Sequence, residues 1–454
     1  MWTVDDLISN LMAKQKTKSI KQWRIRCLDT EREEFYLIQD NSTKVALDQA
    51  RKVSREFIEV SLFVPKPESG VHGQARKQLF PIKELEPQLQ EILEEARLSS
   101  EEAWAFTEQV EAPTQGAMTC YPPLVENLSK AAAQINEEFL STIKNHQEAE
   151  FNSAELFVTK EKERLYLSNG FSGENLVSKI YSEVCFSQTD PDTGISEEYL
   201  LTESGAHPEQ LNFSELCENS SSGAGYSLVT EKPQSGEYSV LVGSEVLLQV
   251  LNDFVGQFDT ANKYFGFPFF ESGSAVINGF SGTPFTLWLD PQLDYAYGSK
   301  EYDNSGTLQK KIKLVENNKV VGNCNSQRMS EYNKQPVTTT LGNVCIEASG
   351  LPVAELRESA PKVIEILQFS GLFSDSRTLT FSSEIRLARL FDNESGQVKY
   401  LKGGSISGSF RDNFKKVKWS KETGVTNTDF GMMGGSSAYF GPKYALLSDV
   451  TLSS

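Results

Sequence analysis

Histidine is nearly absent from this sequence of 454 residues, and its distribution is uneven. The chain holds only His72, His146 and His207, so nothing after position 207 carries an imidazole. A Ser-His-Asp or Cys-His nucleophile in the second half would have to take its imidazole from the first half. His146 is expected at the polar end of a helix and His207 in a loop before Pro208, which favours surface positions for both.

Closely spaced cysteine pairs are also missing. The six cysteines lie far apart, and no Cys-x-x-Cys pair occurs among them: Cys27, Cys120, Cys185, Cys217, Cys324 and Cys345. This spacing favours reduced, mostly buried thiols over a disulfide framework. The sequence therefore predicts a cytoplasmic location.

The chain has no excess of positive charge. Its formal net charge is -18 and its isoelectric point is about 4.8. A duplex-binding surface needs clustered lysine and arginine, so no nucleic-acid partner is expected. One basic and aromatic stretch, residues 410–422, is interpreted as a strand with a solvated face.

No long apolar run is present either. The N-terminus begins with acidic residues, where a signal peptide needs a basic flank. The most apolar stretch, residues 264–289, is interrupted by Glu271, two prolines and several glycines. The sequence therefore predicts neither secretion nor a membrane-spanning segment.

The pattern of apolar residues divides the chain into two parts. The first part mixes strand-like runs at 22–28, 34–40 and 57–64 with amphipathic helices at 85–96 and 124–143. The second part consists mainly of short strand-like runs between turn residues. We therefore predict an α+β protein, with an N-terminal α/β domain at 1–225 and a largely antiparallel β-rich C-terminal domain at 226–454. The polar, turn-rich stretch 187–236 should contain the boundary.

Two helices are expected in the second domain. The run 237–259 reads as a short strand, a break at Gly243-Ser244 and then a helix, with apolar residues at helical spacing. Its apolar face comprises Val246, Leu247, Val250, Leu251, Phe254 and Phe258. Gln249, Asn252 and Asp253 lie on its polar side. The second helix is expected over 351–371, ending near Gly371.

Four acidic residues, Asp290, Asp294, Glu301 and Asp303, offer an alternative kind of site. Such carboxylates could serve glycoside hydrolysis or bind a cation through oxygen. They lie in Asp-Pro and Asp-Asn-Ser-Gly sequences, however, and these are turn signals. Turns are therefore the favoured interpretation.

The second half resembles the C-terminal domain of the TldD/TldE (PmbA) family. The resemblance rests on "GEYSVLVGSEVLLQVL" at 236–251, the stretch 288–323, "TTTLGNVCIEASG" at 338–350 and "GGSISGSFRDN" at 403–413, in this order. "RLYLSNGFSG" at 164–173 extends a weaker resemblance into the first half. In this family the TldD-type subunit carries a His-Glu-x-x-x-His zinc motif on the helix after the strand, and a cysteine near the C-terminus supplies a further ligand.

The resemblance places Gln249, Val250 and Phe254 at the three motif positions and Phe430 near the cysteine position. None of these side chains supplies an imidazole, a thiolate or a general base. The resemblance therefore implies no catalytic residue and no metal in this chain. It implies instead a TldE/PmbA-type subunit, with zinc in its partner.

The resemblance implies a heterodimer with a TldD-type zinc-bearing subunit that encloses unfolded peptides for proteolysis or peptide maturation. A stand-alone homodimer that binds peptides without cleaving them is the alternative, and an enzyme using carboxylates or another cofactor is a third possibility. The candidate partner surface is an aromatic cluster: Phe265, Phe267, Phe269 and Phe270. The competing interpretation places these rings in the core.

Overall fold

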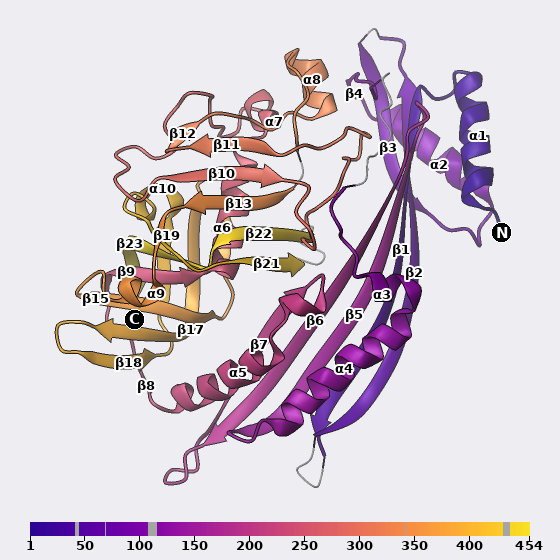
Figure 1. Ribbon diagram of the computed structural model, residues 1–454. Coiled ribbons are helices and arrows are strands. Elements are labelled where there is room, and N and C mark those ends of the chain that lie inside the picture. Colours follow the sequence, from indigo (N-terminus) through magenta and orange to yellow (C-terminus); the bar gives the residue numbers. More distant parts are fainter. Residues whose placement is uncertain (41–44, 69, 108–115, 341, 430–435) are drawn as a thin grey trace.

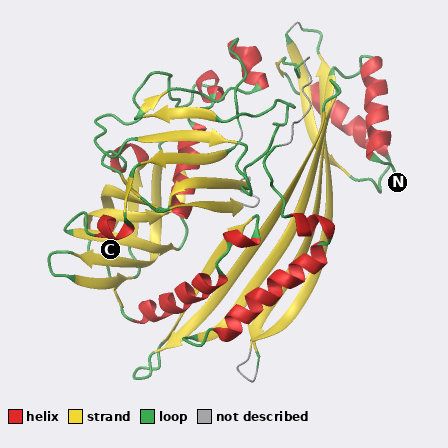
Figure 2. Ribbon diagram, viewed as in Figure 1, coloured by secondary structure: helices red, strands yellow, loops and turns green. Residues whose placement is uncertain are grey.

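The chain is divided between a long N-terminal sheet and a strand-rich C-terminal domain (Figure 1). The computed structural model describes residues 1–40, 45–68, 70–107, 116–340, 342–429 and 436–454. Helices and strands occur in both parts (Figure 2), which confirms the predicted α+β class. Within the described residues, no helix combines the length and apolar character that crossing a membrane requires.

The N-terminal sheet has seven strands in the order β4-β3-β2-β1-β5-β6-β7, and every neighbouring pair is antiparallel. Its strands are β1 (Gln22–Gln39), β2 (Val45–Pro65), β3 (Val71–Leu79), β4 (Glu101–Glu102), β5 (Glu150–Leu167), β6 (Ser172–Thr189) and β7 (Ser196–Gly205). Side chains alternate between the two faces of such strands. One face therefore packs under helices, while the opposite face carries mostly polar and charged residues.

The helices of this half cover a single face of the sheet (Figure 2). They are α1 (Val4–Lys16), α2 (Leu85–Leu98), α3 (Pro122–Glu126), α4 (Leu128–Asn145), a 3-10 turn (Pro208–Gln210) and α5 (Phe213–Leu228). The predicted helix at 85–96 is confirmed. The predicted helix at 124–143 is split, because the Asn127 side chain accepts from the Lys130 N–H at 3.0 Å and begins α4 there.

The stretch 187–236 is more regular than its composition indicated. It contains the end of β6, all of β7 and α5, so most of it is regular secondary structure and not turns. Small residues occur in α5 because the helix packs tightly on β7. A Cβ on Gly223 would lie 2.1 Å from the Tyr199 ring, and the Ser220 hydroxyl donates to the Tyr199 carbonyl. The predicted boundary between 225 and 226 falls inside α5.

The C-terminal domain contains two further sheets. The six-stranded sheet comprises β10 (Phe285–Asp290), β11 (Ile312–Glu316), β12 (Lys319–Val320), β13 (Asn343–Ala348), β21 (Thr423–Asp429) and β22 (Ser436–Pro442). The ten-stranded sheet comprises β8 (Thr230–Glu231), β9 (Gly236–Gly243), β14 (Gly350–Leu351), β15 (Lys362–Phe369), β16 (Phe373–Asp375), β17 (Thr380–Asp392), β18 (Gln397–Leu401), β19 (Ser405–Ser409), β20 (Lys418–Ser420) and β23 (Tyr444–Ser453). Most strand pairs in both sheets are antiparallel, as predicted.

Among the described residues, the helices of this domain are α6 (Ser244–Gly256), α7 (Thr260–Tyr264), α8 (Gln327–Asn333), α9 (Val353–Arg357) and α10 (Phe410–Asn413). The helix predicted over 351–371 was wrong beyond Arg357. Pro361 disfavours a helical conformation at the residue before it, and the β-branched Val363, Ile364 and Ile366 then form β15 between β9 and β17.

The two parts meet through a group of packed, mostly aromatic side chains around Tyr302 and through several ion pairs. Tyr302 of the C-terminal domain packs with residues of the N-terminal half: Phe63, Trp104, Phe106, Leu165, Leu167 and Phe171. The Lys300 ammonium lies 2.7 Å from Glu163, and the Lys179 ammonium lies 2.8 Å from Asp429. These contacts fix the C-terminal domain against the polar face of the N-terminal sheet.

Candidate functional site

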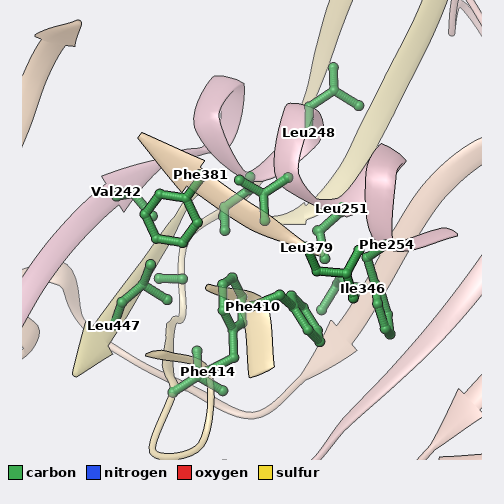
Figure 3. Close-up of a cluster of buried hydrophobic side chains, with 14 of the residues drawn as sticks. Val242, Leu248, Leu251, Phe254, Ile346, Leu379, Phe381, Phe410, Phe414 and Leu447 are labelled. Carbon is green, nitrogen blue, oxygen red and sulfur yellow. The ribbon is translucent and has the colours of Figure 1, made fainter. Parts of the chain in front are cut away.

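The helix α6 follows β9 directly, as the sequence predicted, and lies against the largest core of the protein. Its apolar side chains Leu247, Val250, Leu251 and Phe254 are buried in this core. The Phe254 ring stacks on Phe410 at 4.1 Å between ring centroids (Figure 3). The helix is therefore held rigidly by one face, and only its other face is available for chemistry.

The polar face of α6 makes specific hydrogen bonds. The Gln249 amide donates to the Leu372 carbonyl at 2.8 Å, and the Asn252 side chain accepts from the Ser437 hydroxyl at 3.3 Å. Ser437 lies in β22, just after residues 430–435. This face of α6 therefore looks toward the C-terminal part of the chain, where the resemblance expects the remaining ligand.

The motif positions expected from the sequence do not form a site. Val250 is 6% exposed and Phe254 is fully buried, so two of the three positions point into the core. In this register two of the three side chains are enclosed by the core and could not reach a metal. Phe430 lies outside the described residues.

A shift of three residues along α6 keeps the motif spacing, although the Gln257 side chain is itself only 1% exposed. It places Asn252, Asp253 and Gln257 at the three positions of His-Glu-x-x-x-His, and all three side chains are polar. The Gln257 amide donates to the carbonyls of Ser376 and Arg377 at 2.7 and 3.0 Å. The sequence already argued against the first register, since the apolar spacing assigned Val250 and Phe254 to the buried face of the helix.

Asp253 is the one carboxylate among these three side chains. Its Oδ2 atom is buried without a hydrogen-bond partner among the described residues. Burial raises the pKa of the Asp253 carboxyl, the Ser374 hydroxyl acts in the opposite direction, and the charge of Asp375 raises the pKa further. A carboxyl group in this environment favours its neutral form more than an exposed aspartate does.

These residues do not fit a zinc ion. Zinc sites in proteins use imidazole, thiolate and carboxylate ligands, whereas Asn252 and Gln257 offer amides that are already engaged with protein groups. Within the described part of the chain, no group of three or more His, Cys, Asp or Glu side chains is arranged to hold a metal. No catalytic step through a metal follows from α6.

The alternative carboxylates occupy separate turns. Asp303 accepts from the N–H groups of Ser305 and Thr307, Asp290 accepts from Gln292 N–H, and Asp294 accepts from Met118 N–H. Asp290 is also paired with Lys311 at 3.1 Å. The turn interpretation accounts for Asp290 and Asp303, whereas Asp294 forms a long-range hydrogen bond to the N-terminal half.

The aromatic side chains predicted as a partner surface are split between the surface and the core. Phe265 is 55% exposed and Phe267 is 42% exposed, and Phe269 is half-buried. Phe270 is 4% exposed and packs against Phe254 in the core, so this ring does not belong to a partner surface. The exposed part of the cluster is therefore Phe265 and Phe267.

Comparison with known proteins agrees with this architecture of a β-rich domain carrying one strand-helix unit. A family model described as the PmbA/TldA metallopeptidase C-terminal domain matches residues 235–453. The C-terminal domain thus belongs to this family of domains, as its sequence resemblance implied. A search of curated proteins found no match.

Several solved structures share the whole fold. A candidate modulator of DNA gyrase from Bacteroides thetaiotaomicron is 15% identical, with a TM-score of 0.77 and full coverage of both chains. A second, from Thermotoga maritima, is 16% identical with a TM-score of 0.72, again over both full chains. TldE from Thermococcus kodakarensis is 14% identical with a TM-score of 0.70, covering 98% of this chain and 100% of the other. At these identities the likeness defines the fold alone.

Proposed function

We propose that the chain is a non-catalytic, TldE/PmbA-type subunit of a TldD/TldE-type zinc metallopeptidase complex that acts on unfolded peptides. The observation that carries the proposal is the polar face of α6, where Asn252, Asp253 and Gln257 take the positions of His-Glu-x-x-x-His. The helix keeps the packing of a catalytic scaffold and lacks the ligands for a metal. Zinc is therefore assigned to a TldD-type partner subunit.

The role of this chain is then to complete a chamber and to hold the peptide, in proteolysis or in peptide maturation. The likeness in fold to TldE from Thermococcus kodakarensis supports this assignment. All six cysteines are free thiols and five are buried, which supports a reducing, cytoplasmic location. The alternative function is a homodimer that binds peptides without a zinc-bearing partner.

The exposed rings Phe265 and Phe267 are proposed to contact the partner subunit. Replacing both by serine is expected to weaken association with the zinc-bearing subunit by at least tenfold, because aromatic residues are enriched among the strongest contacts of interfaces. The melting temperature should stay nearly unchanged, since surface substitutions alter stability by about 0.5 kcal/mol or less. Pull-down of the co-expressed subunits, followed by thermal melting, measures both effects.

A matched control is Ile82→Ser, which removes an apolar side chain that is 78% exposed on the N-terminal half. The control should retain the partner. A folded Phe265→Ser/Phe267→Ser protein that binds its partner as tightly as the wild type would contradict the interface assignment.

A further inference from the structure

The polar face of the N-terminal sheet carries a row of aromatic side chains on three neighbouring strands. The rings of Tyr36 and Phe157 lie 5.6 Å apart between centroids, and those of Phe157 and Tyr181 are stacked, also at 5.6 Å. We call Tyr36, Phe157 and Tyr181 the aromatic ladder. All three rings are half-buried, and none belongs to a buried cluster of the described residues.

Strand alternation places the aromatic ladder opposite the helices. The neighbouring side chains Leu37, Leu156 and Ile180 point the other way and pack beneath α4 and α5. The ladder therefore lies on the face that the C-terminal domain approaches. Aromatic side chains on this face stabilise the sheet as cross-strand pairs and also offer apolar area to a binding partner.

Two carboxylates lie beside the ladder without a compensating cation. Glu155 and Glu183 are directly opposite each other in the antiparallel register of β5 and β6. Neither takes part in an ion pair within the described residues, although Glu183 accepts a hydrogen bond from the Tyr181 hydroxyl at 2.7 Å. Like charges in directly opposite positions destabilise a sheet, so this pair costs stability in the isolated chain.

The electrostatics of Glu155 agree with this arrangement. Burial makes the largest contribution to raising the pKa of the Glu155 carboxyl, and the charges of Glu183 and Glu34 raise this pKa further. A cation placed between Glu155 and Glu183 would relieve this repulsion.

The protein's own arginines show how the ladder receives a cation. The Arg51 guanidinium lies 4.9 Å from the centre of the Tyr36 ring, and that of Arg32 lies 5.8 Å from the centre of Phe157. Both arginines approach from the β1 and β2 side, and Arg32 is paired with Glu34 at 3.5 Å. The β5 and β6 side, with Tyr181, Glu155 and Glu183, is without such a cation among the described contacts.

The ladder also leads toward the candidate site. Lys179 lies on the same face two residues before Tyr181, which is about 7 Å along a strand. It pairs with Asp429, the last described residue before Phe430. An extended chain lying along β6 from the ladder would therefore reach the end of β21, close to the polar face of α6.

We propose that the aromatic ladder, with Glu155 and Glu183, binds lysine or arginine side chains of an extended peptide and makes the complex selective for basic segments. This inference rests on the proposed function, because it names the peptide class that the non-catalytic subunit would hold. Aromatic rings attract a cation over their faces, and the carboxylates supply the opposite charge.

The test uses the full chain alone and two labelled, unstructured peptides of equal length. One peptide carries lysine and arginine where the other carries glutamine, and fluorescence anisotropy measures both dissociation constants. The basic peptide is expected to bind at least about tenfold more tightly at low salt, and added salt should reduce this preference. The Glu155→Gln/Glu183→Gln protein should lose the preference.

The matched control is Glu137→Gln/Glu218→Gln, which removes two exposed carboxylates from α4 and α5 on the opposite face. This control removes the same charge and should keep the preference. The Glu155→Gln/Glu183→Gln protein should also melt at the same or a higher temperature than the wild type, since the repulsion is gone.

Three results would overturn the inference. They are equal binding of the two peptides by the wild type, an equal loss of preference in the control protein, and a lower melting temperature on removal of Glu155 and Glu183. If the wild type self-associates and the Glu155→Gln/Glu183→Gln protein does not, the face is assigned to a second copy of the chain instead. Pairing with a zinc-bearing subunit is measured in a separate experiment. If the chain pairs with such a subunit but binds both peptides equally, the basic-peptide inference is rejected and the proposed function is retained.

Discussion

Replacing Phe254 by alanine is expected to lower the free energy of unfolding by about 3–5 kcal/mol, the range measured for large aromatic truncations in protein cores. Phe254 is fully buried, and its ring contacts Phe258, Phe270 and Phe410. The truncation leaves a cavity between α6 and the strands around it. Denaturant unfolding followed by fluorescence or circular dichroism measures the change.

The matched control on the same helix is Gln249→Ala. It removes one hydrogen bond to the Leu372 carbonyl, and its expected cost is about 1 kcal/mol. The difference between the two variants measures how much more the buried face of α6 contributes to stability than this single hydrogen bond. A Phe254→Ala protein as stable as the wild type would contradict the assignment of Phe254 to the core.

Replacing Glu365 by glutamine is expected to cost about 3 kcal/mol, toward the lower end of the range for breaking buried ion pairs. The Glu365 side chain is 3% exposed, and its carboxylate pairs with Arg357 at 2.7 Å and with Arg389 at 2.6 Å. The substitution leaves two guanidinium groups facing an amide. Both arginines are about a quarter exposed, so water compensates part of the loss.

The control for Glu365 is Glu358→Gln, an exposed carboxylate just after α9. It should change the melting temperature little, because exposed charges contribute little to stability. Urea midpoints of the two variants give the comparison. Equal midpoints would show that the Arg357–Glu365–Arg389 cluster does not hold β15 in place.

The sequence predicted the strand-helix unit at 237–258 well, because its apolar spacing and the break at Gly243 are local signals. The same spacing was sufficient to reject Val250 and Phe254 as site positions. Asn252 and Asp253 were recognised as polar, but Gln257 was missed, although the expected apolar face already extended to Phe258. Only the structure shows its amide bonded to Ser376 and Arg377.

Two segments misled the sequence analysis for tertiary reasons. Small and polar residues at 219–227 indicated turns, but they form α5 because its close approach to Tyr199 requires small side chains. The apolar residues of 353–367 matched a helix, although burial between two strands decided the conformation after Pro361. The aromatic ladder was invisible in the sequence, since its rings come from strands far apart along the chain and meet only through the sheet register.

The central claim is that this chain lacks a zinc centre and works beside a subunit that has one. The most direct test is to isolate the chain from its native host, identify the co-purifying protein, and measure zinc and peptidase activity in the complex and in the separated chain. We predict a partner with a His-Glu-x-x-x-His motif, zinc and chelator-sensitive cleavage of unfolded peptides in the complex, and neither zinc nor cleavage in the separated chain. One tightly bound zinc per separated chain, together with chelator-sensitive peptidase activity, would contradict the claim.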